Sequence, residues 1–172
     1  MVNDDRESVE AIRERYRPER IKTLFVGESP PYSGAFFYCG GNAMLTHMQR
    51  AVEVALSVAF GESGNFLKCF KAYGWYLDDL VLTPVNNLTK SQRNAKCRDA
   101  QKCLAGRIAA YRPEAIVSLL IRIKPFVDGA AIKAHSNAPR YAVPFPGMGQ
   151  QERFQARMAC IIPKLPRLTE PT

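Results

Sequence analysis

One stretch, residues 22–41 (KTLFVGESPPYSGAFFYCGG), constrains the fold more than any other part of the chain. It starts with an apolar run at 24–26, turns at 27–31 and continues into aromatic residues interleaved with glycines. An apolar run that ends in glycine, an acid and prolines predicts a buried strand whose carboxyl end opens into a loop. Ligands bind at that end of the strands in open α/β sheets. We therefore expect this loop to belong to a binding site.

The alternation of apolar runs and amphipathic segments predicts an α/β fold. We expect a three-layer α/β/α sandwich with a central four-stranded, mostly parallel sheet. Asn42 is expected to cap the helix over 42–60, and Gly61 is expected to end it. Ser91 is expected to cap the basic helix over 91–110. The proline-rich tail is expected to fray. The expected helices cover 4–17, 42–60, the segment around 66–70, 91–110, 122–134 and 150–161, and the expected strands cover 22–26, 75–82, 115–120 and 141–143.

Length and composition are those of an ordinary globular protein. The 172 residues, 47% hydrophobic and 23% charged, suit one domain covering 1–172. The apolar runs fall short of the roughly 18 residues of a membrane span, and the charged start MVNDDRESVE is unlike a secretory signal. We expect a cytoplasmic monomer without a membrane partner. Five cysteines without a CxxC pair, and two histidines, favour reduced thiols and predict neither a metal nor a cofactor.

The chain carries a net charge of +8. Such an excess favours a polyanionic partner, of which nucleic acid is the first candidate. The alternative is a basic protein without such a partner. The basic helix over 91–110 is expected either to line a nucleic-acid path or to be a solvated face.

The carboxyl ends of parallel strands meet at one edge of the sheet, which brings distant loops together. The loop at 27–31 is then joined by the proline–glycine loop at 144–149 and by the PVNN loop after the second strand. We expect a cleft there, lined by Glu28, Ser29, Phe36, Phe37, Asp79, Asn86 and the loop 144–149.

The GESPP sequence at 27–31 and the GAFF sequence at 34–37 resemble motifs of the uracil-DNA glycosylase superfamily. The first motif of that family follows strand one in forms such as GQDPY or GEAPG. A Gly-x-x-Phe segment then supplies the aromatic ring that stacks on the flipped base. The resemblance assigns this stacking role to Phe37, and the alternative is plain core packing.

Two later segments extend the resemblance over about 22–160. Residues 76–81, YLDDLV, are similar to the family's second strand, with Asp79 in place of its base-reading Asn. Residues 143–147, VPFPG, are similar to its last motif, with Pro146 as the motif proline. The resemblance implies a monofunctional DNA glycosylase that flips a base and hydrolyses its bond to deoxyribose. It implies no metal or cofactor.

Three departures from the family pattern bear on catalysis. Phe145 stands where the family has a histidine that stabilises the leaving base, and Ser29 stands where several branches have Asp or Asn. The cysteines that bind an iron–sulfur cluster in one branch are missing. These departures keep open a catalytically weak or inactive member that binds nucleic acid and senses modified bases. A hydrolase or transferase for a small ligand is a third reading of the fold.

Glu28 and Asp79 are the carboxylates to which we assign chemistry, together with Ser29. Glu28 is expected to stabilise the cation-like sugar or orient the attacking water, or else to cap its own turn. An ionised Asp79 accepts hydrogen bonds only, which favours an amino-bearing base over uracil. The expected target is therefore a cytosine-derived or otherwise modified base, as in phage DNA, and uracil is the alternative. The alternative is that Asp78, Asp79 or both are solvated or form an ion pair with Arg93 or Arg98. Further expected base contacts are Phe36, Asp78, Asn86 and Phe145.

The loop at 144–149 and the helix after it are expected to contact DNA. Met148 lies where the family inserts an apolar wedge into the duplex, and the alternative is a loosely packed loop methionine. Gln150 and Arg153 lie at a helix N-terminus, which suits a phosphate. Further expected DNA contacts are Pro30, Pro31, Pro146, Gly147, Lys90 and Arg93.

Overall fold

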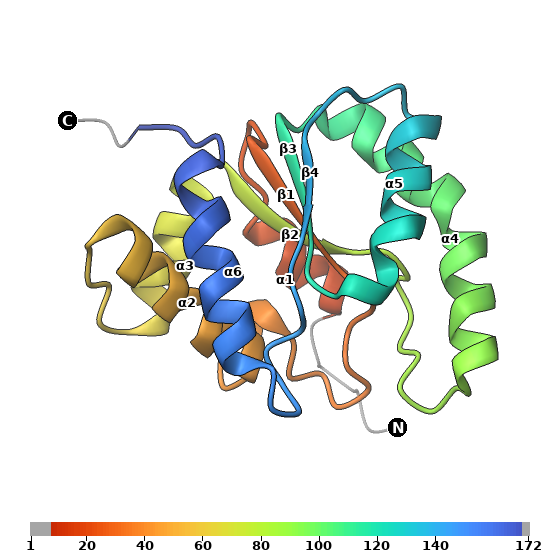
Figure 1. Cartoon of the computed structure of the whole chain (residues 1–172), viewed down its shortest axis with the longest axis horizontal. Coiled ribbons are helices and arrows are strands. Elements are labelled where there is room, and N and C mark those ends of the chain that lie inside the picture. Colours follow the sequence, from red (N-terminus) through yellow and green to blue (C-terminus); the bar gives the residue numbers. More distant parts are fainter. Residues whose placement is uncertain (1–7, 170–172) are drawn as a thin grey trace, which may run out of the picture.

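A computed structural model describes residues 8–169 and has four parallel strands between two layers of helices (Figure 1). This confirms the expected α/β/α sandwich with a central four-stranded sheet. The strand order is β2-β1-β3-β4, so the first strand lies inside the sheet. The strands are β1 (Thr23–Gly27), β2 (Trp75–Asp79), β3 (Ala115–Ser118) and β4 (Arg140–Ala142).

The helices cover both faces of the sheet. One layer contains α2, α3 and α6, and α4 packs against α5 on the other face (Figure 1). Within residues 8–169, no helix combines the length and apolar character needed to cross a membrane. The helices are α1 (Val9–Arg15), α2 (Ala43–Leu56), α3 (Ser63–Ala72), α4 (Lys90–Tyr111), α5 (Lys124–Lys133) and α6 (Gln151–Ile161), and the short 3₁₀ turns are η1 (Phe37–Cys39), η2 (Ile121–Ile123) and η3 (Ile162–Lys164).

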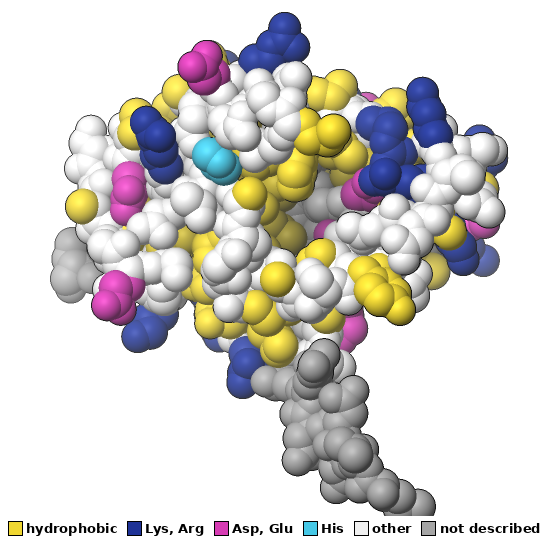
Figure 2. All heavy atoms as spheres, turned by 90° about the horizontal axis from the view of Figure 1, so that it is seen from below, with side chains coloured by type: hydrophobic (Ala, Val, Ile, Leu, Met, Phe, Trp, Pro, Cys, Tyr) yellow, Lys and Arg dark blue, Asp and Glu magenta, His cyan; other side chains and the backbone are white. Residues whose placement is uncertain are grey.

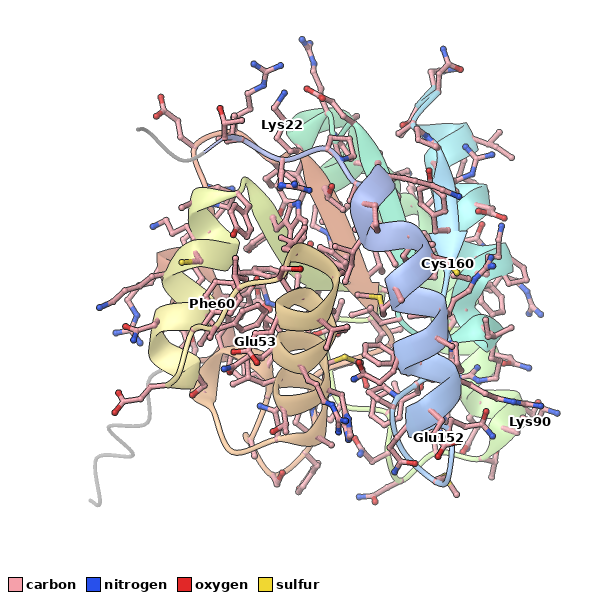
Figure 3. All side chains as sticks on the ribbon, turned by 60° about the vertical axis from the view of Figure 1, so that its left-hand side comes forward. Lys22, Glu53, Phe60, Lys90, Glu152 and Cys160 are labelled. Carbon is pink, nitrogen blue, oxygen red and sulfur yellow. The ribbon has the colours of Figure 1, made fainter. Side chains whose placement is uncertain are left out.

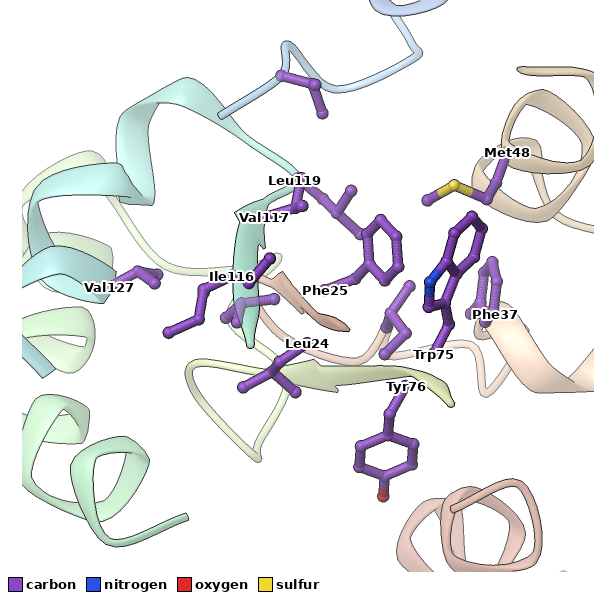
Figure 4. Close-up of a cluster of buried hydrophobic side chains, with 14 of the residues drawn as sticks. Leu24, Phe25, Phe37, Met48, Trp75, Tyr76, Ile116, Val117, Leu119 and Val127 are labelled. Carbon is purple, nitrogen blue, oxygen red and sulfur yellow. The ribbon is translucent and has the colours of Figure 1, made fainter. Parts of the chain in front are cut away.

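The core follows from the two-residue period of the strands, which sends successive side chains to opposite faces. Phe25 and Trp75 point to the α2 side, where they meet Met48 (Figure 4). Leu24 and Tyr76, one residue away on each strand, point to the other face. All five side chains are at most 2% exposed, so both faces of the sheet are buried.

The second helix begins as expected but ends earlier. The Oδ1 atom of Asn42 accepts a hydrogen bond from Leu45 N at 2.9 Å, which confirms the predicted cap. The helix ends at Leu56 rather than near Gly61, because Ser57 adopts a left-handed conformation with φ 54°. The following turn is held by Glu53, whose carboxylate accepts from Phe60 N at 3.0 Å (Figure 3).

Other boundaries also differ from the sequence prediction, and β3 ends at Ser118 rather than at residue 120. Thr89 rather than Ser91 caps α4, through a reciprocal pair of hydrogen bonds with Gln92. The second strand ends at Asp79 rather than at residue 82, and its last residue pairs with Gly27 at the end of β1. The first helix begins at Val9, and residues 4–7 of its predicted range lie outside the described part of the chain.

The expectation that the tail frays is wrong for its described part. The carbonyl of Pro166 accepts hydrogen bonds from Thr23 Oγ1 at 2.8 Å and from Trp75 Nε1 at 2.9 Å. Leu168 N adds a bond to the carbonyl of Tyr73 at 2.9 Å. The tail therefore contacts the amino-terminal edge of the sheet, opposite the edge at which the strands end.

Candidate functional site

A cavity of about 910 Å³ lies at the carboxyl edge of the sheet. Its walls come from the segments that follow all four strands and from the start of α2, so the predicted convergence of loops is present. Seen from this edge, the hollow is bordered by hydrophobic side chains, with acidic and basic side chains gathered on one side (Figure 2).

Most side chains predicted for the site line this cavity. Four do not: Asp78 is buried away from it, and Pro146, Arg153 and Lys90 are absent from its walls. The predicted residues that line it are Glu28, Ser29, Pro30, Pro31, Phe36, Phe37, Asp79, Asn86, Arg93, Phe145, Gly147, Met148 and Gln150.

Asp79 is held from behind by a buried arginine that the sequence analysis did not find. The Nη2 atom of Arg13, on α1, donates to Asp79 Oδ2 at 2.7 Å, and its Nη1 donates to Asp78 Oδ1 at 2.5 Å. Arg13 is only 1% exposed, and its charge is compensated mainly by these two carboxylates, with Glu10 Oε1 at 3.8 Å from its Nη2 atom. Arg107 from α4 completes the network by donating to the carbonyl of Asp79 at 2.8 Å. Asp78 and Asp79 are therefore buried rather than solvated, and the alternative of an ion pair is met by Arg13 rather than by Arg93 or Arg98.

The second carboxylate oxygen of Asp79 is the one left for the cavity. Among residues 8–169, Oδ1 accepts no hydrogen bond, and it packs so closely on Gly27 that a Cβ there would overlap it. Burial raises the pKa of Asp79 to about 6, although Arg13 acts to lower it. A cavity-lining carboxyl group is thus placed to exchange a proton near neutral pH, and the glycine before Glu28 makes room for it.

Glu28 has the opposite surroundings at the end of β1. Arg93 donates from Nε to Oε1 at 3.1 Å and from Nη2 to Oε2, and Nη2 of Arg122 also donates to Oε1. Burial acts to raise the pKa of Glu28, but the hydrogen bonds from the two arginines outweigh it and lower the pKa below its ordinary value. Because arginines rather than backbone N–H groups hold the carboxylate, the alternative that it caps its own turn is wrong.

Arg122 is a cavity residue that the sequence analysis missed. It lies in η2, directly after β3, and its Nη1 donates to Asn94 Oδ1 at 2.8 Å. Its position just past a strand end is the signal that could have identified it, since the same rule pointed to Glu28 and Asp79. The predicted helix over 122–134 concealed that position, because its regular part begins only at Lys124.

Phe36 and Phe37 line the cavity and also belong to the core. Each is 4% exposed, and the ring of Phe37 packs 5.3 Å from that of Phe70, centroid to centroid. The guanidinium of Arg13 lies 5.8 Å from the centre of the Phe36 ring. Core packing therefore holds both rings at the cavity wall, which confirms the core-packing interpretation of Phe37, and its stacking role stays a prediction.

The loop over 144–149 projects its methionine into solvent. Met148 is 100% exposed and adopts a left-handed conformation with φ 51°, followed by Gly149 with φ 80°. This argues against a packed loop methionine. Phe145, 45% exposed, lies at the cavity rim, and Arg153 turns back to donate to Gln150 Oε1 at 3.4 Å.

Within residues 8–169, no group of three or more His, Cys, Asp or Glu side chains is arranged to hold a metal ion. Comparison of the chain with protein-family models and with curated proteins gives no match.

Proposed function

We propose that this protein is a monofunctional DNA glycosylase, which takes a base flipped from DNA into the cavity and hydrolyses its N-glycosidic bond. The observation that carries the proposal is the carboxyl group of Asp79, buried at the cavity wall with one oxygen held by Arg13 and the other unoccupied. The resemblance of 22–160 to the uracil-DNA glycosylase superfamily and the net charge of +8 support the same assignment.

The cavity walls suit a nucleobase. Aromatic rings give a stacking surface worth about 1–3 kcal/mol per base, and Phe36 and Phe37 present such rings at the wall. Ligand pockets typically measure about 300–1,000 Å³. The volume of about 910 Å³ therefore leaves room for a base with a substituent.

Asp79 is proposed both to read the base and to assist hydrolysis. Above its pKa of about 6 it is ionised and accepts a hydrogen bond from an exocyclic amine, which favours a cytosine-derived base such as a modified cytosine of phage DNA. The same carboxylate can orient water or stabilise the cation-like sugar. Exposed Met148 is proposed to fill the gap that the flipped base leaves in the duplex.

A second candidate is a binding protein that recognises modified bases without cleaving them. It is favoured by one observation: arginines hold both oxygens of Glu28 and one of Asp79, so no carboxylate among the described cavity residues is wholly free. Phe145 also stands where the superfamily has its histidine.

The test is abasic-site formation on duplexes that contain uracil, unmodified cytosine or modified cytosines, and on modified phage DNA. Asp79→Asn is expected to slow release of the modified base by about 10²–10⁴-fold, the usual contribution of a general acid or base. Asp78→Asn is the matched control, because it breaks the same arginine network outside the cavity and is expected to stay within about tenfold of wild type.

Equal losses in the two variants, with equal losses of stability in urea, would assign Asp79 a structural role only. Binding of modified DNA without abasic sites on any substrate would establish the second candidate. Efficient release of uracil alone would contradict the proposed base preference.

A further inference from the structure

Arg93 and Arg122 approach the cavity wall from two parts of the chain and converge on one carboxylate. Arg93 is the fourth residue of α4, and Arg122 belongs to η2 after β3. Two guanidinium groups against the single charge of Glu28 leave the cluster with an excess of one positive charge.

Both arginines remain accessible from the cavity. The side chains of Arg93 and Arg122 are 35% and 28% exposed, whereas that of Glu28 is 11% exposed. All three residues line the cavity. An anion that enters the cavity can therefore reach the guanidinium groups directly.

The position of Arg122 does not depend on Glu28 alone. Its Nη1 atom donates to Asn94 Oδ1, which leaves the guanidinium anchored on α4 when the carboxylate moves. The cluster therefore has the form of a preformed anion site with one anchored arginine and a carboxylate in the anion position.

Carboxylate and phosphate place their oxygens in similar geometry for guanidinium donors, and arginine binds both through paired hydrogen bonds. We propose that Arg93 and Arg122 form a subsite for a backbone phosphate of nucleic acid, and that Glu28 occupies this subsite until the phosphate displaces it. This inference rests on the proposed function in one respect, namely that the cavity receives a nucleotide of DNA.

Displacement changes the state of Glu28. The arginines that lower its pKa are taken over by the phosphate, so the carboxylate is released beside the bound nucleotide and becomes free to accept a proton or a hydrogen bond from water. The Glu28 carboxylate therefore stays paired with the two arginines until nucleic acid binds in the cavity.

The test is the affinity of Glu28→Gln for a single-stranded oligonucleotide without modified bases, measured over a series of salt concentrations. Removal of the competing charge is expected to tighten binding about three- to tenfold at low salt and to steepen the slope of log K against log salt by about 0.7. Arg122→Gln is expected to do the reverse, with about fivefold weaker binding and a slope shallower by about 0.7.

Glu114→Gln is the matched control. Glu114 also lies between two cations, Arg20 at 3.0 Å and Lys22 at 2.6 Å, but it precedes β3 and so lies at the opposite edge of the sheet. This variant removes the same charge away from the cavity, and it is expected to leave both the affinity and the salt slope at the wild-type values.

Weaker binding by Glu28→Gln would overturn the inference, because it would mean that Glu28 merely holds the arginines in place. If Glu114→Gln tightened oligonucleotide binding equally, the inference would be overturned too, because the change in affinity would then follow from the net charge of the protein alone. In a second arm of the experiment, the affinity for inorganic phosphate is measured by titration. If Glu28→Gln changes the affinity for inorganic phosphate but not the affinity for the oligonucleotide, the subsite binds a free phosphate and not the DNA backbone. These binding results are independent of abasic-site formation, so failure of the glycosylase assay leaves them interpretable.

Discussion

The ends of β1 and β2 carry two carboxylates that line one cavity and contact arginine, yet their pKa values move in opposite directions. Glu28 at the end of β1 has arginine donors on both oxygens, and its pKa is lowered. Asp79 at the end of β2 has Arg13 on one oxygen and is 5% exposed, and burial raises its pKa to about 6. The difference shows that an arginine contact does not by itself fix a protonation state.

The protonation state of each carboxyl group depends on how much hydration it loses by burial and on how many hydrogen-bond donors replace the lost water. Asp79 also lies next to Asp78, whose charge further raises its pKa and which shares Arg13 with it. The end of β1 therefore holds a carboxylate whose arginine donors favour its ionised form, and the end of β2 holds a carboxyl group suited to proton exchange.

The largest expected effect comes from removing Arg13 at the end of β2, and removal of Arg93 at the end of β1 is the comparison. Arg13→Met leaves two carboxylates buried without their main partner and is expected to destabilise the fold by about 3–5 kcal/mol. Arg93→Met removes an arginine that is 35% exposed and is expected to cost at most about 1 kcal/mol. Urea denaturation measures both. Similar losses in the two variants would contradict the contrast between the two ends.

The two carboxyl groups are expected to change the stability of the fold in opposite directions as pH rises. The pKa of Asp79 is 3.8 when unperturbed and about 6 in the fold, so the native state binds more protons between these values and stability falls as pH rises. The full effect is about 3 kcal/mol. Glu28 has a lowered folded pKa, so its smaller contribution is present above its unfolded value of 4.5 and is lost as pH falls.

Asp79→Asn is expected to remove the decline at rising pH, and Glu28→Gln is expected to reduce the decline on the acid side, to which Glu114 with its lowered pKa also contributes. The measurement is the denaturation midpoint in urea between about pH 3 and pH 8. A profile of Asp79→Asn that keeps the wild-type decline above pH 4 would show that another group causes it.

The smallest effect tests the contact between the two ends. Gly27→Ala puts a Cβ against Asp79 Oδ1, and overlap of this kind is expected to cost about 1–3 kcal/mol. Gly106→Ala, within α4 and facing open space, is the control and is expected to be neutral or to stabilise by up to about 1 kcal/mol. Differential scanning calorimetry compares the two. An unchanged melting temperature in Gly27→Ala would show that the carboxylate can move aside freely.

The amino-acid sequence by itself determined the four strands, the layers and most of the cavity walls. These follow from local physics: apolar runs bury as strands, and the segment after each parallel strand reaches the same edge. Asn42 as a cap and Met148 on an exposed loop are likewise readable from neighbouring residues, because a cap or a glycine-flanked turn involves only a few positions.

The electrostatics of the site were decided by the tertiary structure alone. Arg13 meets Asp79 across 66 positions of the chain, and Glu28 meets Arg93 across 65 and Arg122 across 94. From the sequence, Arg93 and Arg98 are the arginines that suggest themselves as partners for Asp79, because charge type is visible in a sequence and pairing is not. Whether a carboxylate is clamped or left to exchange protons depends on its burial and on which donors reach it, and those properties exist only once the chain has folded.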